Sequence, residues 1–135
     1  MTQTIYTDGS SIPNPGPGGW AFCALTDSSD NSPYEWHVSG GEPHSTNNRM
    51  ELTAVIEALN FFPNKKKFHI YSDSQYVIKC ATGEYTRKKN TDLWKKYEIS
   101  SHGKKIKWTW VKGHSNDKYN EIVDVLAKKE TKTKK

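Results

Sequence analysis

The sequence has little of what marks secreted or membrane-embedded proteins. Its 135 residues include only two cysteines, Cys23 and Cys80, which match no metal-binding spacing, so we expect reduced thiols rather than a disulfide framework. No apolar run approaches the ~20 residues that cross a membrane. The amino terminus has no basic region followed by an apolar stretch, so we expect no secretory signal and an intracellular location. The cytoplasm is the first expectation, and a nuclear or viral setting stays open.

Apolar residues are also scarce, at 33% of the chain, and the mean hydropathy is −0.89. Five tryptophans and seven tyrosines nevertheless provide bulky side chains for a core. This balance indicates a globular domain with a polar surface rather than a disordered chain, and the length fits one domain. Nothing in the sequence points to an obligate protein partner, so we expect a monomer.

Positive charge is almost missing from the first half of the chain. Residues 1–60 carry one cation, Arg49, and seven acidic residues, a net charge of −6. Residues 61–135 carry nineteen Lys or Arg and eight acidic residues, a net charge of +11. A basic half is typical of proteins that bind a polyanion, and nucleic acid is the first candidate. The alternative is that these lysines only solvate the surface of a lean domain.

Hydrophobic periodicity predicts nine regular elements in the order β-β-β-α-β-α-α-β-α. Strands are expected at residues 3–8, 19–26 and 34–40, and the Pro- and Gly-rich SSIPNPGPGG between the first two is expected to be a loop. The later elements lie in STNNRMELTAVIEALNFF (helix), FHIYSDS (strand), SQYVIKCATG (helix), TDLWKKYEISSHG (helix), KIKWTWVKG (strand) and residues 118–130 (helix). This order predicts an α/β domain over residues 1–130, a mixed sheet with helices on its faces, and a basic tail over 131–135.

Four carboxylates stand in short, unusual contexts: Asp8 in TIYTDGS, Glu51 in TNNRMEL, Asp73 in IYSDSQYV and Asp124 in NEIVDVLA. The first three lack the adjoining Lys or Arg expected of a surface ion pair. Acidic groups that converge without cations must be neutralised in some other way. A pair of hard divalent cations would do this, and such ions could also act on a phosphodiester.

The helical period separates Glu51 from Glu57 on the same predicted helix. The apolar stripe of that helix is centred roughly 75° from Glu51 and roughly 165° from Glu57. Glu51 therefore borders the buried face, where a carboxylate is costly unless it is paired or bound to a metal. The alternative is a structural ion pair with Arg49 or Arg87.

Asp8 lies at the end of the first predicted strand, and Asp73 lies at the end of the strand predicted in FHIYSDS. Ligand sites in open α/β sheets gather beyond the carboxyl ends of parallel strands, so the two would end side by side if their strands are parallel neighbours. The alternative for each is a strand-end or helix-capping Asp.

Asp124 lies off the apolar stripe of its helix and reads as a surface residue by pattern alone. The same holds for His114, on a polar loop, although it could also carry a proton near pH 7.

A specific set of segments runs through nearly the whole chain in one order: TDGSSIPNPGPGGWA, TNNRMEL, SDSQYV, DLW, W-W-V-K-G-H and N-E-x-x-D. On these segments the chain closely resembles type 1 ribonuclease H. The resemblance implies the ribonuclease H fold, a mixed five-stranded sheet flanked by helices, which agrees with the element order above. It also implies an endonuclease that hydrolyses the RNA strand of an RNA–DNA hybrid and leaves 5′-phosphate and 3′-hydroxyl ends.

The resemblance also implies roles for individual residues. The positions that match the family's metal-binding carboxylates are Asp8, Glu51, Asp73 and Asp124. They imply two Mg²⁺ ions, for which Mn²⁺ could substitute, and His114 falls on the catalytic-loop histidine. The positions that match hybrid-contacting residues are Asn14, Thr46, Asn47, Asn48 and Gln75.

The chain departs from the family pattern in two places. The arginine that some relatives carry two residues before Thr46 is His44 here, and the basic protrusion of bacterial-like relatives is reduced to TRKKNTD. Lysines within residues 65–67 and 104–107, together with residues 87–89, are candidates to compensate. Two other functions stay open: a non-catalytic hybrid-binding module, and a different nuclease of the same fold.

Overall fold

The computed structural model describes residues 2–26, 34–113 and 117–134. Its strands are β1 (Thr2–Ser11), β2 (Gly16–Leu25), β3 (Glu35–Ser45), β4 (Lys67–Ser72) and β5 (Lys105–Trp110). Its helices are α1 (Asn47–Phe61), α2 (Gln75–Ala81), α3 (Thr91–Ser101) and α4 (Lys118–Thr133). The predicted order of elements is confirmed.

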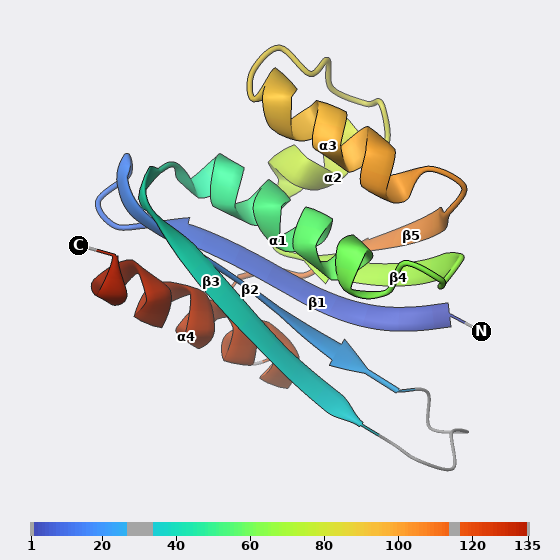
Figure 1. Ribbon diagram of the computed structural model, residues 1–135, viewed down its shortest axis with the longest axis horizontal. Helices are drawn as coiled ribbons and strands as arrows, with labels where there is room; N and C mark the ends of the chain where they lie inside the picture. Colours follow the sequence, from blue (N-terminus) through green and yellow to red (C-terminus); the bar gives the residue numbers. More distant parts are fainter. Residues whose placement is uncertain (1, 27–33, 114–116, 135) are drawn as a thin grey trace.

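The strands form one mixed sheet in the order β3-β2-β1-β4-β5. The pairs β1–β2 and β2–β3 are antiparallel, whereas β1–β4 and β4–β5 are parallel. Helices α1, α2 and α3 lie on one side of the sheet and α4 on the other (Figure 1). The parallel neighbours β1 and β4 therefore send their carboxyl ends to the same edge.

Several element boundaries differ from the prediction, and β3 continues to Ser45 past its expected end at residue 40. Strands β1 and β2 continue into SSIPNPGPGG and leave only residues 12–15 between them, because their pairing extends to Ser11 and Gly18. The Ser11 hydroxyl lies 3.0–3.1 Å from the carbonyl oxygens of Pro13, Gly16 and Ser45, donates its one proton to this set of acceptors, and ties this turn down. Helix α4 runs three residues past the expected end at 130, so the expected basic tail begins inside the helix.

The core lies mainly between the sheet and α1. Leu52, Val55 and Leu59 of α1 are fully buried against Ile5 and Ile70 of the sheet. Glu57 is exposed, as the helical period predicts. A smaller cluster under α4 contains Ala21, Cys23, Val123 and Ala127.

Two glycines set how closely the helices approach the sheet. A Cβ on Gly9 would lie 2.2 Å from the carbonyl carbon of Met50 in α1. A Cβ on Gly19 would lie 2.0 Å from the carbonyl oxygen of Ala127 in α4. Any larger residue would push a helix away, so these contacts place α1 and α4 close to the end of β1.

Neither cysteine is paired: Cys23 and Cys80 are both buried and free. Among the described residues, no helix is both long enough and apolar enough to span a bilayer.

Candidate active site

The parallel ladder between β1 and β4 ends at the pair Thr7–Ser72. The residues that follow this pair are Asp8 after Thr7 and Asp73 after Ser72, so the expected parallel neighbours do bring these carboxylates together. Asp8 is not at the end of its strand, however, because β1 continues beside β2 to Ser11. The site therefore forms where the β1–β4 pairing stops rather than where β1 stops.

Glu51 reaches the same point from α1. The close approach of Gly9 to Met50 and Glu51 brings this turn of the helix against β1 next to Asp8. One carboxylate oxygen from each of Asp8, Glu51 and Asp73 lies within 4.8 Å of the others. Asp8 is buried, and Glu51 and Asp73 are half-buried, each with one carboxylate oxygen shielded from solvent.

The two structural ion pairs considered for Glu51 do not form. Arg49 donates to both carboxylate oxygens of Asp92 at 3.0 and 2.8 Å. Arg87 pairs with Glu98, and its guanidinium lies 4.4 Å from the centre of the Trp94 ring. Both cations are thus engaged by acidic residues of α3, and the ion-pair interpretation of Glu51 is wrong.

Asp73 is not the cap of the helix that follows it. Ser74 is the N-cap of α2, and its hydroxyl accepts from the backbone N–H of Val77 at 3.1 Å. The side chain of Asp73 is therefore free for another role.

Two oxygen atoms of this carboxylate group carry the strongest evidence for a ligand. Glu51 Oε1 and Asp73 Oδ1 are buried and have no hydrogen-bond partner among the described residues. An unsatisfied buried polar atom costs about 1–3 kcal/mol, more if it is charged. Convergent carboxylate oxygens without cations are the donor set that hard divalent cations prefer. The arrangement therefore fits a divalent metal ion.

The electrostatics of the group agree with this fit. Burial, reinforced by the negative charges of Asp73 and Asp124, raises the pKa of Asp8 to about 8. Burial, together with the charges of Asp8 and Asp73, raises the pKa of Glu51 well above its usual range. Carboxylates so perturbed in one place are typical of functional sites.

Asp124 approaches from the other face of the sheet, on α4. Its charge adds to the raised pKa of Asp8, but it is outside the tight group of three carboxylates. It forms an ion pair with Lys128 at 3.2 Å, and its side chain is 25% exposed. His114 lies outside the described residues.

Four of the five residues expected to contact nucleic acid gather where the β1–β2 turn meets the start of α1. Asn14 Oδ1 accepts from the backbone N–H of Asn47 at 3.1 Å, and Asn47 Oδ1 accepts from that of Ser11 at 2.6 Å. Thr46 is the N-cap of α1 and Asn48 is an exposed residue of its first turn. The fifth, Gln75, begins α2 directly after Asp73 and Ser74.

Sequence reasoning missed two residues that position the site. Gly9 permits the contact of β1 with α1, and its signal was the Asp-Gly pair inside a strand rather than after one. The Trp110 indole N–H donates to the backbone carbonyl of Asp73 at 3.2 Å and holds the end of β4. Nothing local in the sequence marks this second contact.

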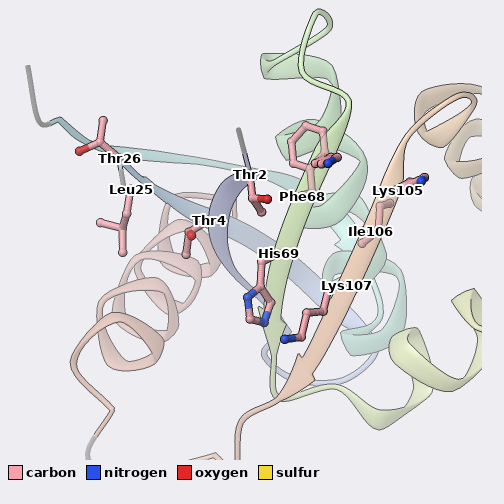
Figure 2. Close-up of a pocket in the computed structure, with 10 residues that line it drawn as sticks. Thr2, Thr4, Leu25, Thr26, Phe68, His69, Lys105, Ile106 and Lys107 are labelled. Atoms are coloured by element: carbon pink, nitrogen blue, oxygen red, sulfur yellow. The ribbon is translucent and has the colours of Figure 1, made fainter. Parts of the chain in front are cut away.

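A basic cavity of about 710 Å³ lies at the opposite end of the sheet from the carboxylates (Figure 2). Its walls include His69, Lys67, Lys105 and Lys107, from the amino-terminal ends of β4 and β5. Lys104 differs from these lysines because its ammonium bonds the carbonyl oxygens of Phe62, Pro63 and Lys65 and so has a structural role.

The model of the RNase H family matches residues 1–132. The chain belongs to the RNase H family. It is 43% identical to the Ribonuclease H of Polaromonas sp. (strain JS666), with 93% of this chain and 87% of that protein covered. It is 42% identical to the Ribonuclease H of Neorickettsia sennetsu, with 93% and 90% covered. The predictions of this family and of a ribonuclease H enzyme, a hydrolase, are confirmed.

Solved structures of RNase H proteins show the same fold. The N-terminal RNase H domain of a Mycobacterium tuberculosis protein superposes with a TM-score of 0.84 at 21% identity, covering 98% of this chain and 95% of that one. LC11-RNase H1, solved in complex with an RNA/DNA hybrid, superposes with a TM-score of 0.76 at 23% identity, covering 94% of this chain and 97% of that one. The predicted ribonuclease H fold is therefore confirmed.

Proposed function

We propose that this RNase H is an endonuclease that hydrolyses the RNA strand of RNA–DNA hybrids with two Mg²⁺ ions, leaving 5′-phosphate and 3′-hydroxyl ends. The proposal rests above all on the convergence of Asp8, Glu51 and Asp73 with two buried oxygens that have no hydrogen-bond partner among the described residues. The hybrid bound to LC11-RNase H1, a protein of the same fold, supports this substrate. We expect the enzyme to act as a monomer.

The carboxylates would hold the metal and keep it next to the scissile phosphate. Bound Mg²⁺ would supply Lewis-acid chemistry, lowering the pKa of water and neutralising charge on the phosphate, and Mn²⁺ could substitute. Asp8, Glu51 and Asp73 offer the oxygens that already converge, and Asp124 would join them by leaving Lys128. His114, which follows Gly113 in the sequence, would move a proton during turnover.

The amide side chains suit recognition of RNA by its sugar. The amide oxygens of Asn14 and Asn47 already accept backbone hydrogen bonds, which fixes the orientation of their NH₂ groups. These groups could donate to RNA 2′-hydroxyls, as could Asn48 and Gln75, which are exposed. Thr46 would contact a phosphate of the DNA strand through its O–H. Such contacts do not read base identity, so little sequence preference is expected.

The proposal is tested with end-labelled RNA–DNA hybrid and Mg²⁺. We expect cleavage of the RNA strand only, no cleavage without a divalent cation, and product ends that a 3′-hydroxyl-dependent polymerase can extend. Duplex DNA and duplex RNA are the control substrates. Hybrid binding without cleavage would favour the non-catalytic module, and cleavage of duplex DNA would favour another nuclease of this fold.

The lysines around the basic cavity give a separate prediction about binding. We expect Lys105→Glu/Lys107→Glu to weaken hybrid binding about tenfold or more at ~0.1 M salt. The double substitution should also reduce the salt slope of log K by about 2, because each phosphate contact that is lost means about one counterion fewer released on binding. Fluorescence anisotropy over a salt series measures both quantities.

The matched control for that pair is Lys129→Glu/Lys132→Glu, two exposed lysines of α4 with the same change of charge. Equal weakening by both pairs would mean that only net charge matters. An unchanged salt slope in the first pair would show that these lysines do not meet the hybrid.

A further inference from the structure

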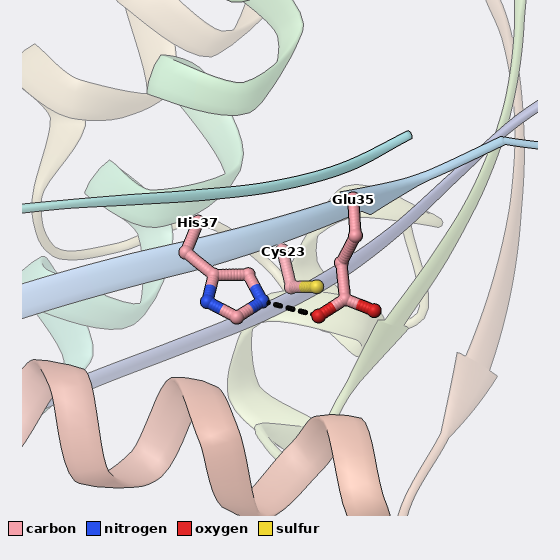
Figure 3. A group of neighbouring side chains, drawn as sticks. All are labelled: Cys23, Glu35 and His37. Carbon is pink, nitrogen blue, oxygen red and sulfur yellow. Dashed lines mark hydrogen bonds and ion pairs between the residues drawn. The ribbon is translucent and has the colours of Figure 1, made fainter. Parts of the chain in front are cut away.

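A second group of side chains with metal-ligand chemistry lies on β2 and β3. Cys23 and His37 are direct cross-strand partners, and Glu35 is two residues from His37 and so on the same face of the sheet. A sulfur, a carboxylate oxygen and a ring nitrogen from the three lie within 4.8 Å of one another. Figure 3 shows the three side chains converging on the side of the sheet where α4 lies.

We propose that Cys23, Glu35 and His37 form a binding site for a zinc-type transition-metal ion, separate from the carboxylate site. Thiolate, imidazole and carboxylate are all zinc ligands, and three protein ligands leave the fourth position of a tetrahedral ion to water. A thiolate and an imidazole disfavour Mg²⁺, which prefers oxygen ligands. The two sites therefore call for different metals and share no residue.

Only small movements of the three side chains are needed for their ligand atoms to bind one metal ion. Zinc lies about 2.0–2.3 Å from such ligands, so pairs of ligand atoms in a tetrahedron are about 3.3–3.6 Å apart. His37 Nε2 and Glu35 Oε2 are now 2.6 Å apart in a hydrogen bond, which the ion would replace. Both side chains are more than a third exposed, at 39% and 38%, so rotating them disturbs no core packing.

Cys23 supplies the fixed member of the group. It is fully buried, and burial followed by the nearby charge of Glu35 raises the pKa of its thiol to about 12. Without metal the thiol is therefore protonated and is not a reactive thiolate, which argues against a redox-sensing role. A bound metal ion would displace this proton, as it does from other cysteine ligands.

An entry path lies beside the group. A cavity of about 630 Å³ is lined by His37 of β3 and by residues of α4 that include Lys118 and Glu121. Glu121 adds a further carboxylate to the lining of this cavity. Because β3 is the edge strand of the sheet, a metal ion here would join it to β2 and stabilise the exposed edge.

The test titrates the full-length protein with Co²⁺, as a spectroscopic substitute for zinc, and then with Zn²⁺, both in excess Mg²⁺. Cobalt bound by a thiolate gives a strong near-ultraviolet charge-transfer band, which an all-oxygen site cannot give. We expect this band in the wild type, its loss in Cys23→Ala, and its retention in Cys80→Ala, which removes the other buried cysteine. We also expect Zn²⁺ affinity to fall at least about tenfold in Cys23→Ala and His37→Ala but not in Asp73→Asn.

Every outcome decides the proposal. A wild type without the band, a band that persists in Cys23→Ala, or Zn²⁺ affinity unchanged by His37→Ala would each overturn it. Since His37 is exposed, its variant keeps the test valid even if Cys23→Ala does not fold. Thermal unfolding gives a second readout, in which Zn²⁺ should raise the midpoint of the wild type and of Cys80→Ala but not of His37→Ala.

Discussion

Asp73→Asn is expected to slow hydrolysis of the RNA strand about 10²–10³-fold or more, the usual cost of losing one group that stabilises charge in a transition state. The amide keeps the size of the side chain but removes a negative charge and an anionic oxygen from the group of three carboxylates. Single-turnover cleavage of labelled hybrid at saturating Mg²⁺ measures the loss. Hybrid affinity should stay within about threefold, because the contacts to sugar and phosphate are made by other residues.

Glu57→Gln is the matched control, since it removes one carboxylate charge from an exposed position on the same helix as Glu51. It should leave the rate unchanged. An Asp73→Asn rate within about tenfold of the wild type would remove Asp73 from the metal site and with it the two-metal proposal.

Glu51→Gln is expected to have opposite effects on activity and stability. It should abolish cleavage, yet raise the free energy of unfolding of the metal-free protein at pH 8 by about 1–3 kcal/mol, the cost of a buried, negatively charged group without a partner. Glu51 Oε1 is such a group, and the carboxyl lies against Asp8 and Asp73. A neutral amide of the same shape removes the repulsion.

The pH dependence follows from the direction of the pKa shifts. Burial raises the pKa of Glu51 well above its usual range and that of Asp8 to about 8. A carboxyl with a raised folded pKa contributes its full stability below its unfolded value, near 4, and loses it as the pH rises through the folded value. The metal-free wild type should therefore lose stability between about pH 4 and pH 8, and the advantage of Glu51→Gln should shrink as the pH falls.

Urea unfolding in EDTA at pH 5 and pH 8 measures both effects. Glu57→Gln should match the wild type at each pH. Adding Mg²⁺ at pH 8 should stabilise the wild type and narrow the difference in free energy of unfolding between it and Glu51→Gln. The reason is that the ion neutralises the complete group of three carboxylates in the wild type, whereas the variant lacks the carboxylate of Glu51. A Glu51→Gln protein that is less stable than the wild type at pH 8 would show that Glu51 has a stabilising partner.

Local sequence patterns were sufficient to predict features that depend only on neighbouring residues. The helical period placed Glu51 on the buried side of α1 and Glu57 in solvent, because side-chain direction in a helix depends only on spacing along the chain. Boundaries were less predictable where pairing between strands decides them. Ser11 and Gly18 remain in the β1–β2 ladder despite the glycines and prolines around them, because cross-strand hydrogen bonds outweigh local turn preference.

The sequence by itself determined the order of elements and the family, since both are carried by motifs and by spacing along the chain. It also predicted four metal-binding carboxylates, of which the structure brings Asp8, Glu51 and Asp73 together. Only the tertiary structure decided whether Glu51 is neutralised by an arginine. Arg49 and Arg87 could each have paired with it, but Asp92 and Glu98 on α3 hold them instead. The convergence of Asp8 with Asp73 likewise depends on the parallel pairing of β1 and β4, which joins residues 65 positions apart. Contacts of that range are set by the whole packed sheet, and no local pattern encodes them.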